Sequence, residues 1–296
     1  MKNQPAGLVH YAIITNPVSG GLDAEQKRSA LAEAAKILGA EIHGLDTRSA
    51  EEFRRCAEQL AGRCDVLVAA GGDGTFSDLI NAVDTRHIAV GFLPLGTGNA
   101  LRHALRYKVD LPRVARRLKQ GSIHHHDLVD CNGEIRAFTA SVGIEGTTIQ
   151  RWQQRRTRGG GGFNTYFIAL LEAYFHTYKR ADAVVQLDQE TREVKDLLSL
   201  MVVKQPYYGF GMKVVPKARF DDRKLHTLCV NSGLIMTLFG GLAAFTAGNP
   251  IGRYRTGKAL KVLLDRPLML QYDGNLGWEA DSFFFRVLPG ALKLKC

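Results

Sequence analysis

Two apolar segments in the first third of the chain each lead into a glycine-rich loop. Residues 66–70 end in Gly71-Gly72-Asp73-Gly74-Thr75, and residues 88–93 are followed by Gly96-Thr97-Gly98-Asn99. A helix-like segment follows each loop, so backbone N–H groups and positive helix termini are expected to gather at one edge of a sheet. Glycine suits such loops because a positive φ and a close approach of the backbone to an anion both exclude a Cβ atom. These segments predict a binding site for a nucleotide polyphosphate.

The first part of the chain alternates between strand-like and helix-like segments. Residues 9–15 predict a strand, and Asp23 and Gly39 predict the start and the end of the helix that follows. A weaker strand is expected at residues 40–45, and Ser49-Ala50-Glu51-Glu52 has the spacing of a capping box for a second helix. This alternation predicts parallel strands joined by right-handed crossovers, which bind ligands at the carboxyl ends of the strands.

The sequence pattern changes near residue 127, where we place a domain boundary. Cys131-Asn132-Gly133-Glu134 predicts a hairpin turn, because Asn-Gly adopts the positive φ angles of a type I′ turn. The later segments are short, strand-like and interrupted by few helices, which predicts a β-sandwich or an open barrel. They span residues 183–187, 197–203, 225–230, 259–264, 268–272, 283–287 and 291–294.

Three segments of the second half differ from this pattern. Residues 150–162 are basic and then glycine-rich, and we expect a mobile loop there. Residues 164–178 predict a helix whose core-facing stripe is made of apolar side chains at helical spacing. This stripe comprises Phe167, Leu170, Leu171, Tyr174 and Phe175. Residues 234–247 are apolar but short and broken by glycine, so we predict a buried helix rather than a membrane span.

The charge of the chain points to an anionic partner. Its 39 Lys and Arg residues exceed the 29 Asp and Glu residues and give a formal net charge of +10. Such an excess favours a phospholipid surface, a polyphosphate or nucleic acid. Nucleic acid is disfavoured because the basic residues are dispersed and no aromatic platform for single strands is evident. The five cysteines form no Cys-x-x-Cys pair and no secretory signal is evident, so we expect a cytoplasmic protein.

Several familiar catalytic and metal-binding patterns fit poorly. A Walker-type P-loop is absent from the sequence, and the Gly-x-Gly spacings do not open the first helix as they do in dinucleotide-binding enzymes. His124-His125-His126 has the residue type of a metal site, but a polar connection between domains explains it better. These patterns therefore disfavour a P-loop enzyme and a dehydrogenase.

Four motifs in this order resemble the diacylglycerol kinase catalytic family, the soluble lipid kinases that include bacterial diacylglycerol kinases and the sphingosine and ceramide kinases. They are Asn16-Pro17-Val18-Ser19-Gly20, Gly71-Gly72-Asp73-Gly74-Thr75, Gly96-Thr97-Gly98-Asn99 and Tyr272-Asp273-Gly274. The resemblance implies an α/β domain with a parallel sheet that binds the nucleotide, followed by a β-rich domain that binds the lipid. We expect the first over residues 1–127, the second over residues 128–287, and a last strand, about 288–296, that returns to the first.

The resemblance also implies transfer of the γ-phosphoryl group of ATP, with Mg²⁺, to a lipid hydroxyl. The residues that match the phosphate-lining positions of the family are Asn16, Gly72, Asp73, Gly74, Thr75, Gly96 and Thr97. Asp73 and Asp127 match positions that organise the metal, mainly through water. Asp273 matches the late catalytic aspartate, which orients or deprotonates the acceptor hydroxyl. Phosphoryl transfer mainly requires positioning and charge neutralisation, and an alcohol acceptor benefits from a nearby carboxylate.

Three positions depart from the family pattern. Ala100 stands where many members have an aspartate of the metal network, and Asn275 stands where a glutamate often follows the catalytic aspartate. The Asp-Gly that usually precedes a strand of the lipid domain appears here as Asp221-Asp222-Arg223, which argues against a second, structural metal site. These departures do not affect Asp273, the residue expected to act on the acceptor hydroxyl.

The residues alone leave alternatives open. Asp273-Gly274 also has the sequence of a tight turn between two strands, with no catalytic role. A soluble-substrate kinase of the NAD kinase type shares the Gly-Gly-Asp-Gly-Thr loop, and Ala100 and Asn275 suggest a catalytically silent nucleotide- or lipid-binding module. The identity of the lipid and the formation of a homodimer stay open.

A soluble lipid kinase needs a way to reach its substrate. We expect transient association with an anionic membrane surface through the basic segment after residue 150, because each basic residue near such a surface contributes about 1 kcal/mol. Trp152 and Phe163 are the expected inserting side chains. The basic side chains are those of Arg151, Arg155, Arg156 and Arg158.

Overall fold

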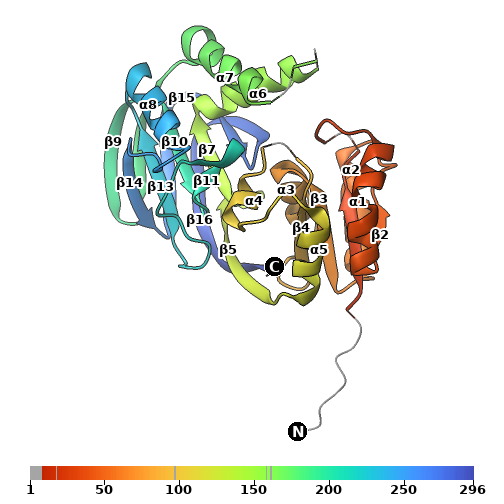
Figure 1. The fold of residues 1–296 in the computed structure, drawn as a ribbon. Helices are drawn as coiled ribbons and strands as arrows, with labels where there is room; N and C mark the ends of the chain where they lie inside the picture. The colour runs from red at the N-terminus through yellow and green to blue at the C-terminus, as the bar shows by residue number, and fades with distance from the viewer. Residues whose placement is uncertain (1–8, 18, 97, 158, 161) are drawn as a thin grey trace. The chain divides into compact units, whose positions relative to one another are not determined.

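A computed structural model describes residues 9–17, 19–96, 98–157, 159–160 and 162–296. These residues form two compact units (Figure 1). The first unit contains the chain up to Gly96, Leu105–His125 and Ala291–Cys296, and the second contains residues 98–104 and His126–Gly290. The first eight residues, on which the prediction about a secretory signal depends, lie outside the described range.

The sheet of the first unit is parallel, with its strands in the order β2, β1, β3, β4. The strands are β1 (Tyr11–Thr15), β2 (Glu41–His43), β3 (Val66–Gly71) and β4 (Ala89–Pro94). Every residue of β1, β3 and β4 is buried, as expected for continuous apolar runs in a parallel sheet covered on both faces. The end of β16 (Asn275–Lys295) joins this sheet in parallel, where Leu294 pairs with Val90.

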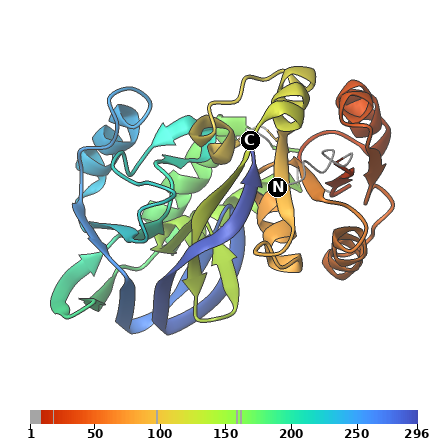
Figure 2. The same ribbon diagram turned by 90° about the horizontal axis from the view of Figure 1, so that it is seen from below.

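Two pairs of helices cover the sheet of the first unit. The helices are α1 (Ala24–Leu38), α2 (Ala50–Ala61), α3 (Asp73–Ala82) and α5 (Leu111–Gln120). α1 packs against α5 and α2 against α3, and Figure 2 shows the two pairs on opposite faces of the sheet. The predicted α/β architecture with a parallel sheet is therefore confirmed.

The predicted helix caps are confirmed in one case and half confirmed in the other. The Asp23 carboxylate accepts the backbone N–H of Gln26, the Gln26 side chain accepts the N–H of Asp23, and Gly39 ends α1 in a left-handed conformation. At α2 the Ser49 hydroxyl accepts the N–H of Glu52, but the Glu52 carboxylate accepts the N–H of Arg48 instead of that of Ser49. The second capping box therefore lacks its reciprocal bond.

The second unit is built on antiparallel strands in the order β14, β13, β10, β7, β15, β16. Their bounds are Thr139–Gly143 for β7, Ser199–Val203 for β10, Leu225–Val230 for β13, Arg253–Gly257 for β14 and Ala259–Tyr272 for β15. The remaining strands are β5 (Ile123–Cys131), β6 (Ile135–Ala137), β8 (Ala181–Leu187), β9 (Glu190–Leu197), β11 (Tyr207–Tyr208) and β12 (Met212–Lys213). Inward-facing apolar side chains of these strands form a buried core. The β-rich second half is therefore confirmed.

Several strands of this unit differ in extent from the prediction. Residues 259–264 and 268–272 form the single strand β15, whose register shifts between Leu263 and Leu268, around Pro267. Residues 283–287 and 291–294 likewise belong to one strand, β16. The sequence pattern missed β9, because nearly all of its residues are polar or charged and face solvent.

Helices lie between the strands of the second unit. They are α4 (Ala100–Ala104), α6 (Ile144–Arg156), α7 (Gly162–Glu172) with a π-helical turn at Ala173–Thr177, a 3₁₀ turn at Gly209–Gly211 and α8 (Leu234–Ala243). The prediction of a mobile loop over residues 150–162 is wrong for its first half, because α6 continues to Arg156. Gln and Arg favour helices, and Arg155 pairs with Glu172 of α7. Arg158 and Gly161 lie outside the described residues.

The apolar helices of this unit are more exposed than predicted. On α7 Tyr166 and Ala169 are buried, and Leu170 and Tyr174 of the predicted stripe pack against the core, whereas Phe167 and Phe175 of that stripe are exposed. The prediction of a buried helix at residues 234–247 is wrong, because Gly240 is the one buried residue of α8. None of the helices in the described residues is long and apolar enough to cross a membrane.

Candidate active site

The carboxyl ends of three strands meet at one edge of the first unit. Thr15 at the end of β1 pairs with Ala70, and Gly71 at the end of β3 pairs with Pro94 of β4. The carbonyl oxygen of Gly71 accepts the backbone N–H groups of Leu95 at 2.9 Å and of Gly96 at 3.1 Å. These two bonds tie the glycine loops after β3 and β4 to each other, as predicted from their positions in the sequence.

The first glycine loop opens directly into a helix terminus. Gly72 occupies the N-cap of α3 without a side chain to cap it, and Asp73, Gly74 and Thr75 form the first turn. The first N–H groups of an α-helix lack intrahelical acceptors, so this turn is suited to an anion. A Cβ atom on Gly71 would lie 2.4 Å from the Thr75 hydroxyl oxygen, so this position requires glycine.

Two hydroxyl groups near this edge lack partners. Thr15 and Thr75 are buried, and their hydroxyl oxygens have no hydrogen-bond partner among the described residues. Buried polar groups are usually paired, so these two hydroxyls are candidate donors to a ligand at the ends of β1 and β3. The arrangement therefore fits a phosphate-bearing group.

Asn16 lies beside this edge, and a buried lysine holds its loop in place. The Lys27 ammonium of α1 donates to the carbonyl oxygens of Asn16 at 2.7 Å and of Pro17 at 2.8 Å. Lys27 is only 2% exposed, and burial lowers the pKa of its ammonium group. Sequence analysis missed this lysine because it looks like any other charged residue on a surface helix.

The second glycine loop contains the point where the chain passes from the first unit to the second. Thr97 lies outside the described residues, so its predicted contact with the phosphates stays a prediction. The carbonyl oxygen of Gly98 accepts the N–H of Phe210 at 2.6 Å. Ala100 is buried at the start of α4 and brings no carboxylate to this position.

Asp273 lies in a tight turn and its carboxylate is held by another segment. Asp273 and Gly274 have φ angles of 45° and 85° and connect β15 to β16, so the turn inferred from the sequence is present. The Asp273 carboxylate accepts the N–H of Thr139 at 2.8 Å, the Thr139 hydroxyl at 3.0 Å and the N–H of Phe138 at 3.2 Å. With 6% exposure, this is a fixed carboxylate rather than a loose surface group.

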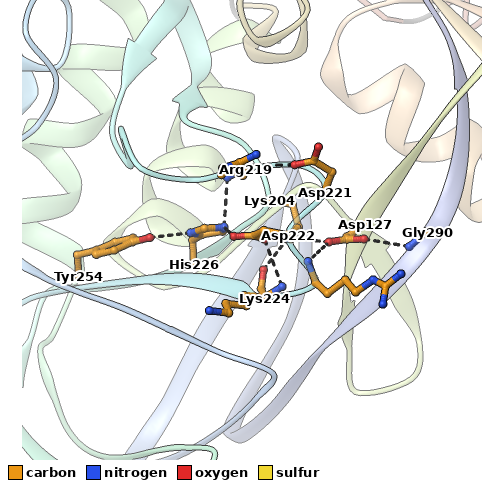
Figure 3. Close-up of polar contacts among 10 residues, drawn as sticks. Asp127, Lys204, Arg219, Asp221, Asp222, Lys224, His226, Tyr254 and Gly290 are labelled. Atoms are coloured by element: carbon orange, nitrogen blue, oxygen red, sulfur yellow. Dashed lines mark hydrogen bonds and ion pairs between the residues drawn. The ribbon is translucent and has the colours of Figure 1, made fainter. Parts of the chain in front are cut away.

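Asp127 lies in a polar network of the second unit (Figure 3). One oxygen of its carboxylate accepts the N–H of Gly290 at 2.9 Å, and the other accepts the N–H of Arg223 at 2.6 Å. The same second oxygen lies 3.0 Å from the ammonium nitrogen of Lys204. These contacts favour a structural role for Asp127, and its predicted contact with Mg²⁺ stays a prediction.

Lys204 fills the centre of this network. Its ammonium, which is fully buried, also lies 2.7 Å from the Asp222 carboxylate and 2.6 Å from the carbonyl oxygen of Lys224. Burial raises the pKa of Asp222, but the hydrogen bond and charge of Lys204 outweigh it and leave that pKa below its usual value. Two carboxylates and a carbonyl would suit a divalent cation, but the lysine ammonium occupies that position.

His226 extends this network to β14. Its Nδ1 lies 2.8 Å from the Tyr254 hydroxyl, and its Nε2 lies 3.0 Å from Asp222 and 3.2 Å from the N–H of Arg219 (Figure 3). Burial lowers the pKa of His226, so the neutral imidazole is favoured. The described residues contain no group of three His, Cys, Asp or Glu side chains arranged to hold a metal ion.

Glu145 is an acid that sequence analysis did not identify. It lies in the first turn of α6, and one carboxylate oxygen accepts the Ser199 hydroxyl. The other oxygen is buried without a hydrogen-bond partner among the described residues. Burial raises the pKa of Glu145 to about 7. Nothing in the sequence around residue 145 signals this environment, because it depends on the contact of Glu145 with Ser199 of β10.

Two family profiles together match most of the chain. Residues 10–131 match the diacylglycerol kinase catalytic domain, and residues 139–296 match the YegS C-terminal NAD kinase beta sandwich-like domain. The boundary between the two matches lies close to the change in sequence pattern near residue 127.

Similar proteins carry related names. The chain is 25% identical over 285 residues to a diacylglycerol kinase of Staphylococcus aureus (strain MRSA252), covering 93% of this chain and 89% of that protein. It is 24% identical over 237 residues to a diacylglycerol kinase of Staphylococcus saprophyticus, covering 78% and 77% of the two chains. A crystal structure of a diacylglycerol kinase from Bacillus anthracis str. Sterne superposes with a TM-score of 0.72 at 16% identity, over 97% of this chain and 96% of that one, which shows the shared fold.

Proposed function

We propose that this chain, which belongs to the family of proteins with a diacylglycerol kinase catalytic domain and a YegS-type C-terminal domain, is an ATP-dependent lipid kinase. The reaction would transfer the γ-phosphoryl group of ATP to the hydroxyl group of a lipid. Each unit would supply one half of the chemistry, with the nucleotide on the first unit and the acceptor hydroxyl on the second.

The edge of the first unit supports the nucleotide half of the proposal. Phosphate groups carry negative charge, and the first turn of α3 offers backbone N–H groups and the positive end of a helix dipole. The bonds from Leu95 and Gly96 to Gly71 hold the second loop beside this turn. The polyphosphate of ATP would lie across these loops, with Asn16 at the end of β1 as a further contact.

Asp273 supports the acceptor half, and its placement is the observation that carries the proposal. Asp273 differs from an ordinary exposed turn residue because its side chain is almost fully buried, with 6% exposure. The Asp273 carboxylate accepts bonds from Phe138 and Thr139, which set its orientation. A carboxylate held in this way would orient the acceptor hydroxyl and take its proton as the phosphoryl group is transferred.

Magnesium would assist at the nucleotide. Mg²⁺ keeps several waters and usually binds one or two carboxylates together with substrate phosphates, and it would neutralise charge on the transferred group. Asp73 in the first turn of α3 is the carboxylate that fits this role, because it stands at the proposed phosphate site.

A panel assay tests the proposal against its main alternative. The full-length protein is incubated with ATP labelled at the γ-phosphate, Mg²⁺ and either NAD or mixed micelles containing one lipid alcohol each. The panel includes diacylglycerol, monoacylglycerol, phosphatidylglycerol, a sphingoid base and undecaprenol. We expect label in one or more lipids and none in NAD. Label in NAD alone would assign the protein to the soluble-substrate kinases. ATP binding without any labelled acceptor would support the alternative of a catalytically silent nucleotide- or lipid-binding module.

A further inference from the structure

In helix α8 the small side chains face the protein and the large apolar side chains face outward, which is the reverse of the usual arrangement. Its side towards the protein carries Gly240, where a Cβ atom would lie 2.5 Å from the Asn249 side chain. Its outer side carries large apolar residues, with Ile235 82% exposed and Leu242 72% exposed. A helix that packs only onto its own protein buries its large apolar residues and exposes polar ones. α8 therefore presents an apolar surface for something outside the chain.

Helix α7 contributes to the same surface. The ring of Phe163 lies 5.4 Å from that of Phe245, just after α8, and 5.5 Å from that of Phe210. Phe163 thus connects the exposed side of α7 to the end of α8. We call the combined surface the apolar face. Its exposed side chains are Phe163, Phe167, Ile168, Ile235, Met236, Phe239, Leu242 and Phe245.

The segments around the apolar face are cationic. Between Asp222 and Asp265 the chain contains no Asp or Glu residue. Arg180 donates to the carbonyl oxygens of Asn231 and Ser232 just before α8, and the N–H of Lys213 bonds to the carbonyl of Ala244 just after it. The one carboxylate of α7, Glu172, is paired with Arg155. Arg180 therefore lies beside the start of α8 and Lys213 beside the segment after its end, while α8 itself carries no charged residue.

We infer that the apolar face docks on the surface of an anionic lipid bilayer, with α8 lying in the plane of the interface. An apolar stripe inserts among the acyl chains while flanking Lys and Arg residues contact anionic headgroups, which is the pattern of interfacial helices. The inference rests on the proposed function, because a lipid kinase must reach a membrane to meet its substrate. It moves the docking surface away from the basic segment of α6, where Arg156 lies over the Trp152 ring and Arg155 is paired.

A second copy of the chain is a less suitable occupant of this face. Two copies that met through their apolar faces would bring two cationic rims together, and like charges across an interface oppose association. An anionic bilayer offers charge of the opposite sign and a deformable apolar layer at once. The charge pattern therefore selects the bilayer over a homodimer.

Vesicle sedimentation without ATP tests the inference. Full-length protein is mixed with vesicles of phosphatidylcholine alone or with about a third phosphatidylglycerol, at low and at high salt. We expect binding to the anionic vesicles that weakens as salt rises. Phe239→Ser and Leu242→Ser together should lower the partition coefficient about tenfold or more, because each removes exposed apolar area.

Matched variants keep the test specific. Phe284→Ser and Val109→Ser remove exposed apolar side chains that lie outside the apolar face, and they should bind vesicles like the wild type. Circular dichroism and thermal unfolding of all variants show whether the fold is kept. Unchanged vesicle binding by a folded Phe239→Ser, Leu242→Ser variant would overturn the inference, and so would concentration-dependent dimerisation in light scattering that the variant abolishes.

A kinase assay on a short-chain acceptor below its micellar concentration separates this inference from the proposed function. If both are right, the apolar-face variants phosphorylate the dispersed acceptor at the wild-type rate and lose activity on vesicles. If neither the wild type nor the variants phosphorylate any acceptor, the proposed function fails. The vesicle-binding experiment still tests the docking surface in that case.

Discussion

The ammonium nitrogen of Lys204 lies 3.0 Å from a carboxylate oxygen of Asp127, and the two side chains are 0% and 4% exposed. Asp222 and the Lys224 carbonyl complete the surroundings of this ammonium. The buried positive charge is therefore compensated by two carboxylates from different parts of the second unit. This arrangement makes Lys204 an internal cation of the unit.

Replacing Lys204 by Met should destabilise the protein strongly. The substitution leaves the buried Asp127 and the partly exposed Asp222 without their shared cation, and removal of one member of a buried ion pair typically costs about 3–5 kcal/mol. Urea unfolding measures the loss. The matched control is Lys195→Met, because Lys195 pairs with Asp182 at 2.7 Å but is 71% exposed, so solvent screens the pair and its loss should change stability little.

Divalent cations should have no effect on the stability of this network. Because Lys204 occupies the position between the carboxylates, the urea midpoint of the wild type without nucleotide should not change between EDTA and millimolar Mg²⁺. Suppose that Mg²⁺ stabilises the wild type and that Lys204→Met leaves the stability unchanged. Both results together would show that a metal ion, not the lysine, holds this network.

Glu145 predicts a dependence of stability on pH. The pKa of Glu145 is raised by burial from 4.5 to about 7, so the folded protein binds a proton more readily than the unfolded chain between these values. Stability is therefore lost as pH rises from 4.5 to 7 and stays lower above pH 7. Glu145→Gln removes this loss and should stabilise the protein at pH 8 by up to about 3 kcal/mol, with little effect near pH 4.

Urea unfolding at pH 4 and pH 8 measures this difference. Glu279→Gln changes an exposed glutamate of β16 and should shift stability equally at both pH values. If Glu145→Gln is no more stabilising at pH 8 than at pH 4, burial does not raise the pKa of Glu145.

The nucleotide edge predicts a requirement for glycine at position 71. In Gly71→Ala the new Cβ atom would lie 2.4 Å from the Thr75 hydroxyl, which must displace the first turn of α3. We expect a loss of about 1–3 kcal/mol in stability and weaker ATP binding in calorimetry. Gly62→Ala is the control, because its Cβ atom would meet its nearest neighbour at 3.8 Å and its φ of −82° suits alanine. Equal ATP affinity of the two variants would show that this loop does not contribute to the nucleotide site.

Elements with a strong local signal could be predicted from the sequence. Residues 225–230 form β13 with the predicted bounds, and Asp23 and Gly39 bound α1 as expected. Apolar runs, caps and glycine loops act through neighbours in the chain, so their patterns are visible without a structure. The two glycine loops were predicted to meet for the same reason, because parallel strands place their carboxyl ends at one edge.

The remaining features depend on contacts between distant segments. Lys204 and Asp127 are 77 positions apart, and nothing near either residue shows that they meet. The exposure of α8 was mispredicted because an apolar helix in sequence is equally compatible with a core and with an external apolar surface. The bonds that fix Asp273 come from a segment about 135 residues away, so the residues alone favoured a plain turn over a catalytic role.

The most direct test of the central proposal compares two aspartates with similar local structure. Asp188, like Asp273, has a positive φ in a hairpin turn, and its carboxylate accepts backbone N–H groups of Lys258 and Ala259 at 2.9 Å. Phosphorylation of the preferred lipid of the panel is measured with saturating ATP and Mg²⁺ for Asp273→Asn and Asp188→Asn. We expect Asp273→Asn to lower kcat by about 100-fold or more while it still folds and binds ATP, and Asp188→Asn to keep its activity. Equal activity of the two variants would contradict the assignment of Asp273 as the residue that acts on the acceptor hydroxyl.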